Sequence, residues 1–150
     1  MSQAIQRLPS SLPFPFSRAV KAGGFLFLSG QVPMSAAGEV VRGDIQTQTR
    51  AACERIVESL AAGGARLDQV VKATVWLSDM SHFAGFNEVY KEFFGAALPV
   101  RSTVASALAL NVDVEIEVQA YIGQDPSGQD PSGQDPSAQD ESGQDESGQD

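Results

Sequence analysis

The sequence contains almost no histidine or cysteine: among its 150 residues, His82 and Cys53 are the only ones of their kind. Zinc sites in proteins are built mostly from several such ligands, so neither a zinc site nor another metal site is expected. There is also no G-x-S-x-G sequence to present a nucleophilic serine beside a catalytic histidine. A single cysteine excludes a disulfide within the chain and fits a reducing compartment.

Long apolar runs are absent as well. The longest one, Phe25 to Leu28, is far shorter than the roughly 20 residues needed to cross a bilayer. The first residues do not resemble a signal peptide. We therefore expect a cytoplasmic protein with no membrane partner.

Basic charge is scarce, with 10 Lys and Arg against 19 Asp and Glu and a net charge of −9. Eight of the acidic residues follow Gly123, where there is no Lys or Arg, so the first 122 residues carry 11 acidic and 10 basic side chains. A nucleic-acid binder would show a basic excess in one of the two parts. No nucleic-acid partner is expected.

Residues 123–150 repeat the sequences GQDPS and GQDES and contain no aromatic or branched aliphatic side chain. Such a segment cannot bury enough apolar surface to offset the entropy of ordering. The sequence therefore predicts one folded domain, residues 1–122, and a disordered acidic tail, residues 123–150. A solubilising or docking segment and a neutral expansion of the repeat are both compatible with this tail.

The first 122 residues predict an α+β domain. After a Pro-rich lead we expect a strand over 25–31, a helix from Asp44 as N-cap to Gly63-Gly64, and a strand over 70–78. A second helix should begin at Ser81 and end at Gly95, followed by strands over 101–108 and 112–122. This order indicates a sheet with both helices on one face.

Two helices leave the other face of such a sheet uncovered. In the first strand Phe25 and Phe27 point one way and Leu26 and Leu28 the other, so either face exposes large apolar side chains, together with Trp76. Exposed apolar patches favour association. We expect a homo-oligomer whose sheets pack against each other.

The segment VDVEIEVQA, residues 112–120, alternates apolar and polar residues as a half-buried strand does. In an oligomer Glu115 would be partly buried, and a buried carboxylate needs a cation or hydrogen-bond donors, or else it takes up a proton. The nearest cation in sequence is Arg101 in LPVRSTV, expected at the start of the neighbouring strand. Its planar guanidinium suits two parallel hydrogen bonds to a carboxylate, either Glu115 or that of a ligand.

LPVRSTV followed by VDVEIEV resembles the signature of the Rid family, the reactive intermediate or imine deaminases, also known as YjgF-type or L-PSP proteins. The resemblance extends from about Leu8 to Ile122 and includes Pro15-Phe16 in the lead segment and the turn sequence SGQVP at 29–33. It also includes a helix pattern formed by Phe83, Ala84, Asn87, Tyr90, Phe93 and Phe94.

The resemblance implies a chorismate-mutase-like α+β fold and a homotrimer whose sheets line a central barrel, with sites between subunits. It implies hydrolysis of 2-imino acids or their enamine tautomers, such as 2-iminobutyrate and 2-aminoacrylate, to 2-oxo acids and ammonia, without metal or cofactor. Arg101 would clamp the substrate carboxylate and Glu115 would activate water. Glu117, on the same face, is the alternative to Glu115, because the connection from Arg101 is about one residue shorter than the family pattern.

The remaining predicted substrate-binding residues are Phe16, Ser29, Gly30, Asn87 and Thr103. Backbone groups around Thr103 and Gly30 would hold the imine nitrogen and the carboxylate. Ser29 could instead cap the turn, and Asn87 could be a structural hydrogen bonder. Many family members have Tyr at the position of Phe16 and Cys at that of Thr103, so neither a phenol nor a thiol can act there in this chain.

These departures leave a second function open, a non-catalytic trimer that binds small carboxylates or acts like a chaperone. A ribonuclease or translation-inhibitor activity has also been attached to the family. The nearly neutral folded part and the lack of a histidine pair for acid–base chemistry disfavour it.

Overall fold

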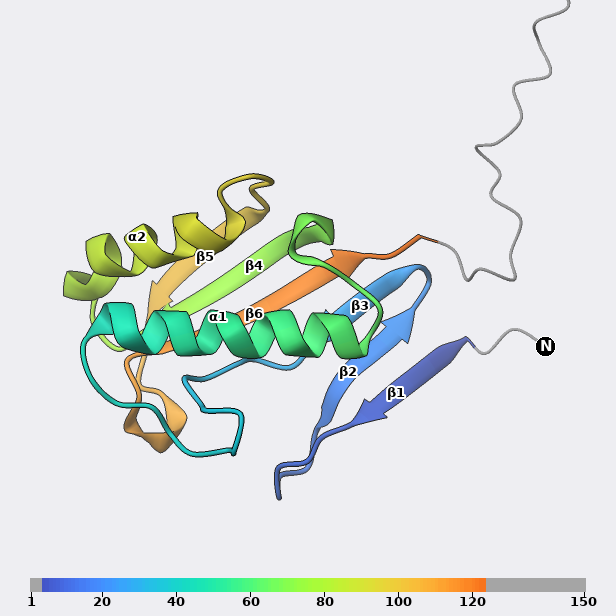
Figure 1. Cartoon of the computed structure of the whole chain (residues 1–150), viewed down its shortest axis with the longest axis horizontal. Helices are drawn as coiled ribbons and strands as arrows, with labels where there is room; N and C mark the ends of the chain where they lie inside the picture. Colours follow the sequence, from blue (N-terminus) through green and yellow to red (C-terminus); the bar gives the residue numbers. More distant parts are fainter. Residues whose placement is uncertain (1–3, 124–150) are drawn as a thin grey trace, which may run out of the picture.

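In residues 4–123, which the computed structural model describes, six strands form one sheet and two α-helices cover one of its faces (Figure 1). The predicted disordered tail lies outside the described residues except for Gly123, so the division at residue 122 stays a prediction. The strands are β1 (Ile5–Pro9), β2 (Ser17–Ala22), β3 (Phe25–Leu28), β4 (Val70–Leu77), β5 (Val100–Ala105) and β6 (Val114–Tyr121), and the helices are α1 (Ile45–Ala62) and α2 (Phe83–Phe94).

The strands lie in the order β1-β2-β3-β6-β4-β5. All neighbouring pairs are antiparallel except β4 and β5, which are parallel and connected through α2. A parallel pair needs such a crossover, whereas β1, β2 and β3 follow one another by short turns. The predicted α+β fold, a mixed sheet with two helices on one face, is confirmed.

The sequence prediction missed two strands, β1 and β2, and treated their residues as an irregular lead. β1 forms one edge of the sheet and ends at Pro9, where the register with β2 shifts. A proline at the end of an edge strand costs no ladder hydrogen bond. β2 pairs with β3 across the two-residue turn at 23–24, and β1 pairs with β2, so pairing with a neighbouring strand orders each of the two segments.

The ends of α1 lie where the local sequence predicts them. The Asp44 side chain accepts a hydrogen bond from the Thr47 backbone N–H at 2.8 Å, which satisfies one of the free amides of the first turn. At the other end, Gly63 N–H donates to the Ser59 and Leu60 carbonyls.

The predicted start of α2 at Ser81 is not correct. Asp79 instead caps a short 3₁₀ turn, and α2 begins at Phe83.

The core lies between the helices and one face of the sheet. Alternate residues of β4 and β6 point into it, and its largest fully buried side chains include Phe86 and Phe94 of α2 and Ile56 and Leu60 of α1. Val71 is 43% exposed. A register shift between Val70 and Lys72 puts Val70 into the core in its place.

Gly63 lets the end of α1 approach the sheet. A Cβ at this position would overlap Leu26 Cδ2 and lie 2.7 Å from Leu26 Cδ1, and Leu26 is fully buried. The φ angle of Gly63 is −91°, which any residue adopts. We expect Gly63→Ala to destabilise the fold by about 1–3 kcal/mol through overpacking, measured by chemical denaturation. Ala62→Ser, on the exposed side of the same turn, should change stability little, and equal stability of both variants would contradict the close approach.

The sheet face opposite the helices carries exposed aromatic side chains. Phe25 and Phe27 are each 38% exposed and Tyr121 is 51% exposed, while Trp76 is half-buried. Leu26 and Leu28 are buried under the helices. The phenylalanines of β3, and not its leucines, therefore form the apolar patch, and the homotrimer that would cover it stays a prediction.

Candidate functional site

The predicted catalytic residues lie on opposite faces of the sheet. On β5, Arg101 pairs with Ala73, which is fully buried under the helices. On β6, Glu115 pairs with Trp76 on the open face. Paired residues point to the same face of a sheet and successive residues alternate. Arg101 therefore points to the helix side and Glu115 to the open side.

The expectation that the strand of Arg101 lies beside the strand of Glu115 is wrong. In the sheet of residues 4–123, β4 lies between β5 and β6, and β5 pairs with β4 alone. Strand order depends on contacts between distant segments, which the alternation of one strand does not encode. Arg101 and Glu115 of one chain cannot form an ion pair, and they can meet only if they come from different copies.

Arg101 lies beneath α2 among aromatic rings. Its guanidinium carbon is 4.8 Å from the centroid of the Tyr90 ring, 5.4 Å from that of Phe86 and 5.6 Å from that of Phe83. Aromatic faces attract a cation without neutralising it. Within residues 4–123, no carboxylate lies within ion-pair distance of Arg101. The rings position the guanidinium while its charge stays available to an external anion.

Three polar atoms on the β5 and α2 side of the sheet are buried without a hydrogen-bond partner within residues 4–123: Asn87 Oδ1, Tyr90 Oη and Thr103 Oγ1. Buried polar atoms normally have partners, so this group is suited to a ligand or another subunit. Burial raises the pKa of Tyr90 to about 12, which keeps its hydroxyl a donor. Tyr90 was not predicted as a site residue, although its spacing of three from Asn87 puts both on one helix face.

Glu115 lies against the turn that follows β3. Backbone hydrogen bonds of 2.8 and 3.0 Å between Gln31 and Ile116 bring this turn beside β6. A Cβ on Gly30 would lie 2.6 Å from Glu115 Oε2 and 2.9 Å from its Cδ. Only glycine leaves this room. Burial, and to a smaller extent the neighbouring Glu117, raises the pKa of Glu115 above its ordinary value, so the carboxylate takes up a proton more readily.

The turn contact distinguishes Glu115 from Glu117. Both face the open side of the sheet, but Glu117 pairs with Thr74, one step further from the turn. Gly30 of the SGQ turn therefore lies close to Glu115 and not to Glu117.

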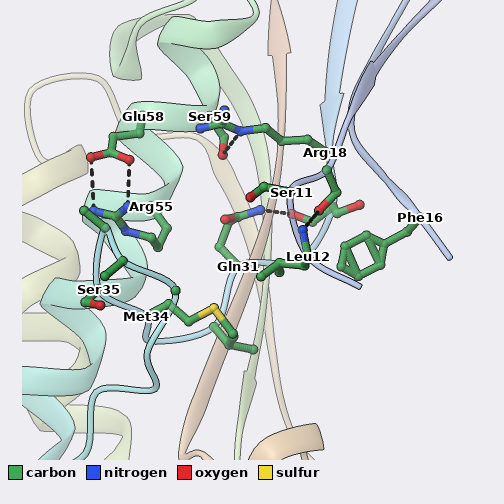
Figure 2. A pocket seen from close by; sticks show the side chains of 17 residues that line it. Ser11, Leu12, Phe16, Arg18, Gln31, Met34, Ser35, Arg55, Glu58 and Ser59 are labelled. Carbon is green, nitrogen blue, oxygen red and sulfur yellow. Dashed lines mark hydrogen bonds and ion pairs between the residues drawn. The ribbon is translucent and has the colours of Figure 1, made fainter. Parts of the chain in front are cut away.

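Phe16, Ser29 and Gly30 line a cavity of about 520 Å³ between the β1–β2 connection, the turn after β3 and α1 (Figure 2). Ser29 Oγ donates a 2.6 Å hydrogen bond to the Ser17 carbonyl, which holds the turn against β2. Ser29 therefore has the structural role considered for it and also lines the cavity. Two arginines, Arg18 and Arg55, also line this cavity. No sequence pattern indicated them as site residues.

His82 has a structural partner. Its Nε2 lies 3.7 Å from Asp113 Oδ1, which also accepts a 2.6 Å hydrogen bond from Ser78 Oγ. The Ser78 hydrogen bond lowers the pKa of Asp113, so this carboxylate is ionised at neutral pH. Because the serine donates to the aspartate and not to the histidine, these three residues do not form a nucleophilic triad.

In the described range 4–123, no three His, Cys, Asp or Glu side chains are grouped so that they could hold a metal ion. Neither α-helix in that range combines the length and the apolar character needed to span a membrane.

Comparison with protein families matches residues 8–122 to the family described as endoribonuclease L-PSP. A RutC family protein from Pyrococcus horikoshii is 50% identical over 109 residues, which are 71% of this chain and 86% of the relative. The Escherichia coli protein named "Putative reactive intermediate deaminase TdcF" is 36% identical over 118 residues, which are 77% of this chain and 90% of that protein.

Solved structures have the same fold. The crystal structure of RidA from the Antarctic bacterium Psychrobacter sp. PAMC 21119 superposes with a TM-score of 0.71 at 34% identity, covering 81% of this chain and 100% of that one. The matched family segment, residues 8–122, begins near the end of β1 and contains β2 to β6 and both helices.

Proposed function

The chain belongs to the endoribonuclease L-PSP family, which includes the YjgF and Rid proteins, and from this premise we propose that it hydrolyses 2-imino acids to 2-oxo acids and ammonia. The observation that carries the proposal is Arg101, a positioned guanidinium without a carboxylate partner within residues 4–123. An α-imino carboxylate is a planar anion, and a guanidinium can bind its two oxygens in parallel. No cofactor is required for this reaction.

In the proposed reaction, water adds to the C=N carbon of the protonated imine while Glu115 accepts a proton from that water. The resulting carbinolamine then loses ammonia as its C–N bond breaks and the C=O bond forms. The proton held by Glu115 passes to the amino nitrogen. As the C–N bond breaks, Glu115 takes the hydroxyl proton and passes it to the departing ammonia, so one protonated imine and one water give one 2-oxo acid and one ammonium ion. An enamine such as 2-aminoacrylate first takes a proton at C3 and enters as its imine tautomer.

The raised pKa of Glu115 supports its role as the base, because a carboxylate with a pKa nearer the working pH exchanges a proton more effectively. The unpartnered Asn87 Oδ1 and Thr103 Oγ1 are suited to accept hydrogen bonds from the imine nitrogen or the ammonia it becomes. Gly30 would contribute its backbone beside Glu115, and Phe16 an apolar wall. Positioning accounts for much of the effect, since imines already hydrolyse in water.

The proposed assembly is a homotrimer in which Arg101 of one subunit and Glu115 of the next form each site. Two observations support it. The two side chains point to opposite faces within a chain, and the open face bears Phe25, Phe27 and Trp76, which water would otherwise contact. We also propose that this trimer is located in the cytoplasm.

A non-catalytic trimer that binds small carboxylates is the alternative. It would use Arg101 in the same way, and the absence of a phenol at Phe16 and of a thiol at Thr103 favours it. Hydrolysis of RNA, which the family description names, has less support. The single histidine, His82, lies 3.7 Å from the Asp113 carboxylate, and the first 122 residues carry no basic excess.

Co-assembly of two inactive variants tests both the reaction and the shared site. Arg101→Ala and Glu115→Gln chains with different affinity tags are produced together, and trimers containing both are purified. In a ring of three, each mixed trimer has one site with both residues, so we expect about one third of the wild-type rate. The rate is measured as loss of 2-aminoacrylate or 2-iminobutyrate generated by a dehydratase.

Two outcomes contradict the proposal in different ways. Wild-type protein that does not accelerate imine loss would exclude the activity. Active wild type with no recovery in mixed trimers would exclude the shared site, and co-assembled Arg101→Ala chains with the same two tags provide the control without recovery.

A further inference from the structure

The cavity beside Gly30 is larger than the smallest 2-imino acids require. Its volume is about 520 Å³, within the roughly 300–1,000 Å³ range of pockets that hold whole drug-sized ligands. Leu12, Phe16 and Met34 form its apolar part (Figure 2). Its polar wall is formed by Arg18 of β2 and by Arg55, Glu58 and Ser59 of α1. A substrate with a longer side chain can therefore be accommodated.

The polar wall carries one unbalanced positive charge. Arg55 donates to both carboxylate oxygens of Glu58, at 2.6 and 3.1 Å, so these two charges neutralise each other. Arg18 donates from Nε to Ser59 Oγ at 3.0 Å, and Ser59 is 3% exposed. Within residues 4–123, no carboxylate lies within ion-pair distance of Arg18.

The bond to Ser59 determines how Arg18 can act. It uses the Nε–H and fixes the plane of the guanidinium, and the two terminal nitrogens remain for another acceptor. A guanidinium presents these donors in the spacing of carboxylate oxygens. Figure 2 shows the Arg18 side chain reaching from β2 to Ser59 on α1, with the Arg55–Glu58 pair on the same helix and Phe16 on the other side of the cavity.

We propose that Arg18 binds a second acidic group, so that the substrates of this protein include 2-imino acids with a carboxylate at the end of the side chain. The inference rests on the proposed deaminase function. Gly30 connects the two places, because it lines the cavity and a Cβ at this position would lie 2.6 Å from Glu115 Oε2. A substrate whose imine lies near Glu115 would direct its side chain past Gly30 between the apolar residues toward Arg18.

The test compares two imines of similar length, 2-iminoglutarate and 2-iminohexanoate, generated by an amino-acid oxidase from glutamate and norleucine. The measured quantity is kcat/KM for imine loss. Arg18→Gln should lower the value for 2-iminoglutarate about ten- to a hundredfold, because a charge-assisted hydrogen-bonded pair is lost. The value for 2-iminohexanoate should change by less than about twofold, since its side chain makes no charged contact.

Glu58→Gln gives the opposite prediction. It removes the carboxylate that neutralises Arg55, so the cavity gains positive charge and kcat/KM for 2-iminoglutarate should rise while that for 2-iminohexanoate stays the same. Arg66→Gln is the matched control, because Arg66 is an exposed arginine paired with Asp68 and does not line the cavity.

The outcomes separate the two proposals. Wild type that accelerates loss of 2-iminohexanoate but not of 2-iminoglutarate overturns the substrate class alone. An equal loss for both imines in Arg18→Gln shows that Arg18 only braces β2 against α1, which also overturns it. Wild type that accelerates loss of 2-iminobutyrate but of neither longer imine also overturns the substrate class alone, whereas wild type that accelerates loss of none of the three imines overturns the deaminase function itself. Protection against thermal unfolding by the product 2-oxoglutarate, present in wild type and absent in Arg18→Gln, gives a second readout that needs no turnover.

Discussion

Arg101→Ala is expected to lower kcat/KM for 2-aminoacrylate or 2-iminobutyrate by about a hundredfold or more, since truncating one partner of a buried charge pair costs about 2–5 kcal/mol. The guanidinium has no carboxylate partner within residues 4–123, so the substrate would supply the only negative charge it binds there. Arg101→Lys keeps the charge but loses the planar pair of donors, and should recover only part of the rate. The rates are measured with the dehydratase-coupled assay.

The control for this variant must account for its packing. Arg101 also lies 4.8 Å from the Tyr90 ring centroid, so its removal costs about 0.5–2 kcal/mol of cation–π energy. Arg50→Ala removes a similar contact, 6.0 Å from the Phe93 ring, from an exposed arginine paired with Glu92. If both variants remain folded and Arg101→Ala retains full activity, Arg101 is not the carboxylate clamp.

The parts of the fold that the sequence predicts are those determined locally. Asp44 and Gly63 mark the ends of α1 because capping involves only neighbouring residues. The alternation of β6 predicts which of its residues are buried. β1 and β2 were not predicted because β2 is ordered by pairing with β3 and β1 by pairing with β2, and the residues of β1 are mostly exposed.

The sequence proposes a set of candidate site residues but not their arrangement in space. Phe16, Ser29 and Gly30, named from the family resemblance, line one cavity in the structure. Arg101 on β5 is separated from Glu115 on β6 because β4 lies between these two strands. Such an order is set by contacts across the whole sheet, so no single motif indicates it.

The polar wall of the cavity shows a second limit of prediction. Arg18 comes from β2, while Arg55 and Ser59 come from α1, and the two segments are far apart in sequence. On a helical pattern Arg55 and Glu58 are an ordinary surface pair at a spacing of three. Only the packing of α1 over the turn after β3 turns this pair into part of a cavity.

Glu115→Gln is expected to lower kcat by about a hundredfold or more, the usual contribution of a positioned general base, and at the same time to stabilise the protein at neutral pH. Burial raises the pKa of Glu115 in the folded state above its ordinary value, so the ionised form opposes folding. Protonated Glu115 stabilises the folded state relative to the ionised form. This stabilisation is fully present below about pH 4, the pKa range of a glutamate in the unfolded chain. It is lost as the pH rises through the pKa of Glu115 in the folded state. Glutamine, always uncharged, avoids this loss.

The Tm of the variant should therefore exceed that of wild type at pH 7 to 8, and the difference should shrink toward zero near pH 4. Glu117→Gln, on the same face but one step from the Gly30 turn, should keep most of the activity. Gly30→Ala places a methyl group against the Glu115 carboxylate and should lower kcat with Glu115 unchanged. If Glu117→Gln abolishes turnover while Glu115→Gln does not, the base is Glu117, the neighbouring carboxylate on the open face of β6.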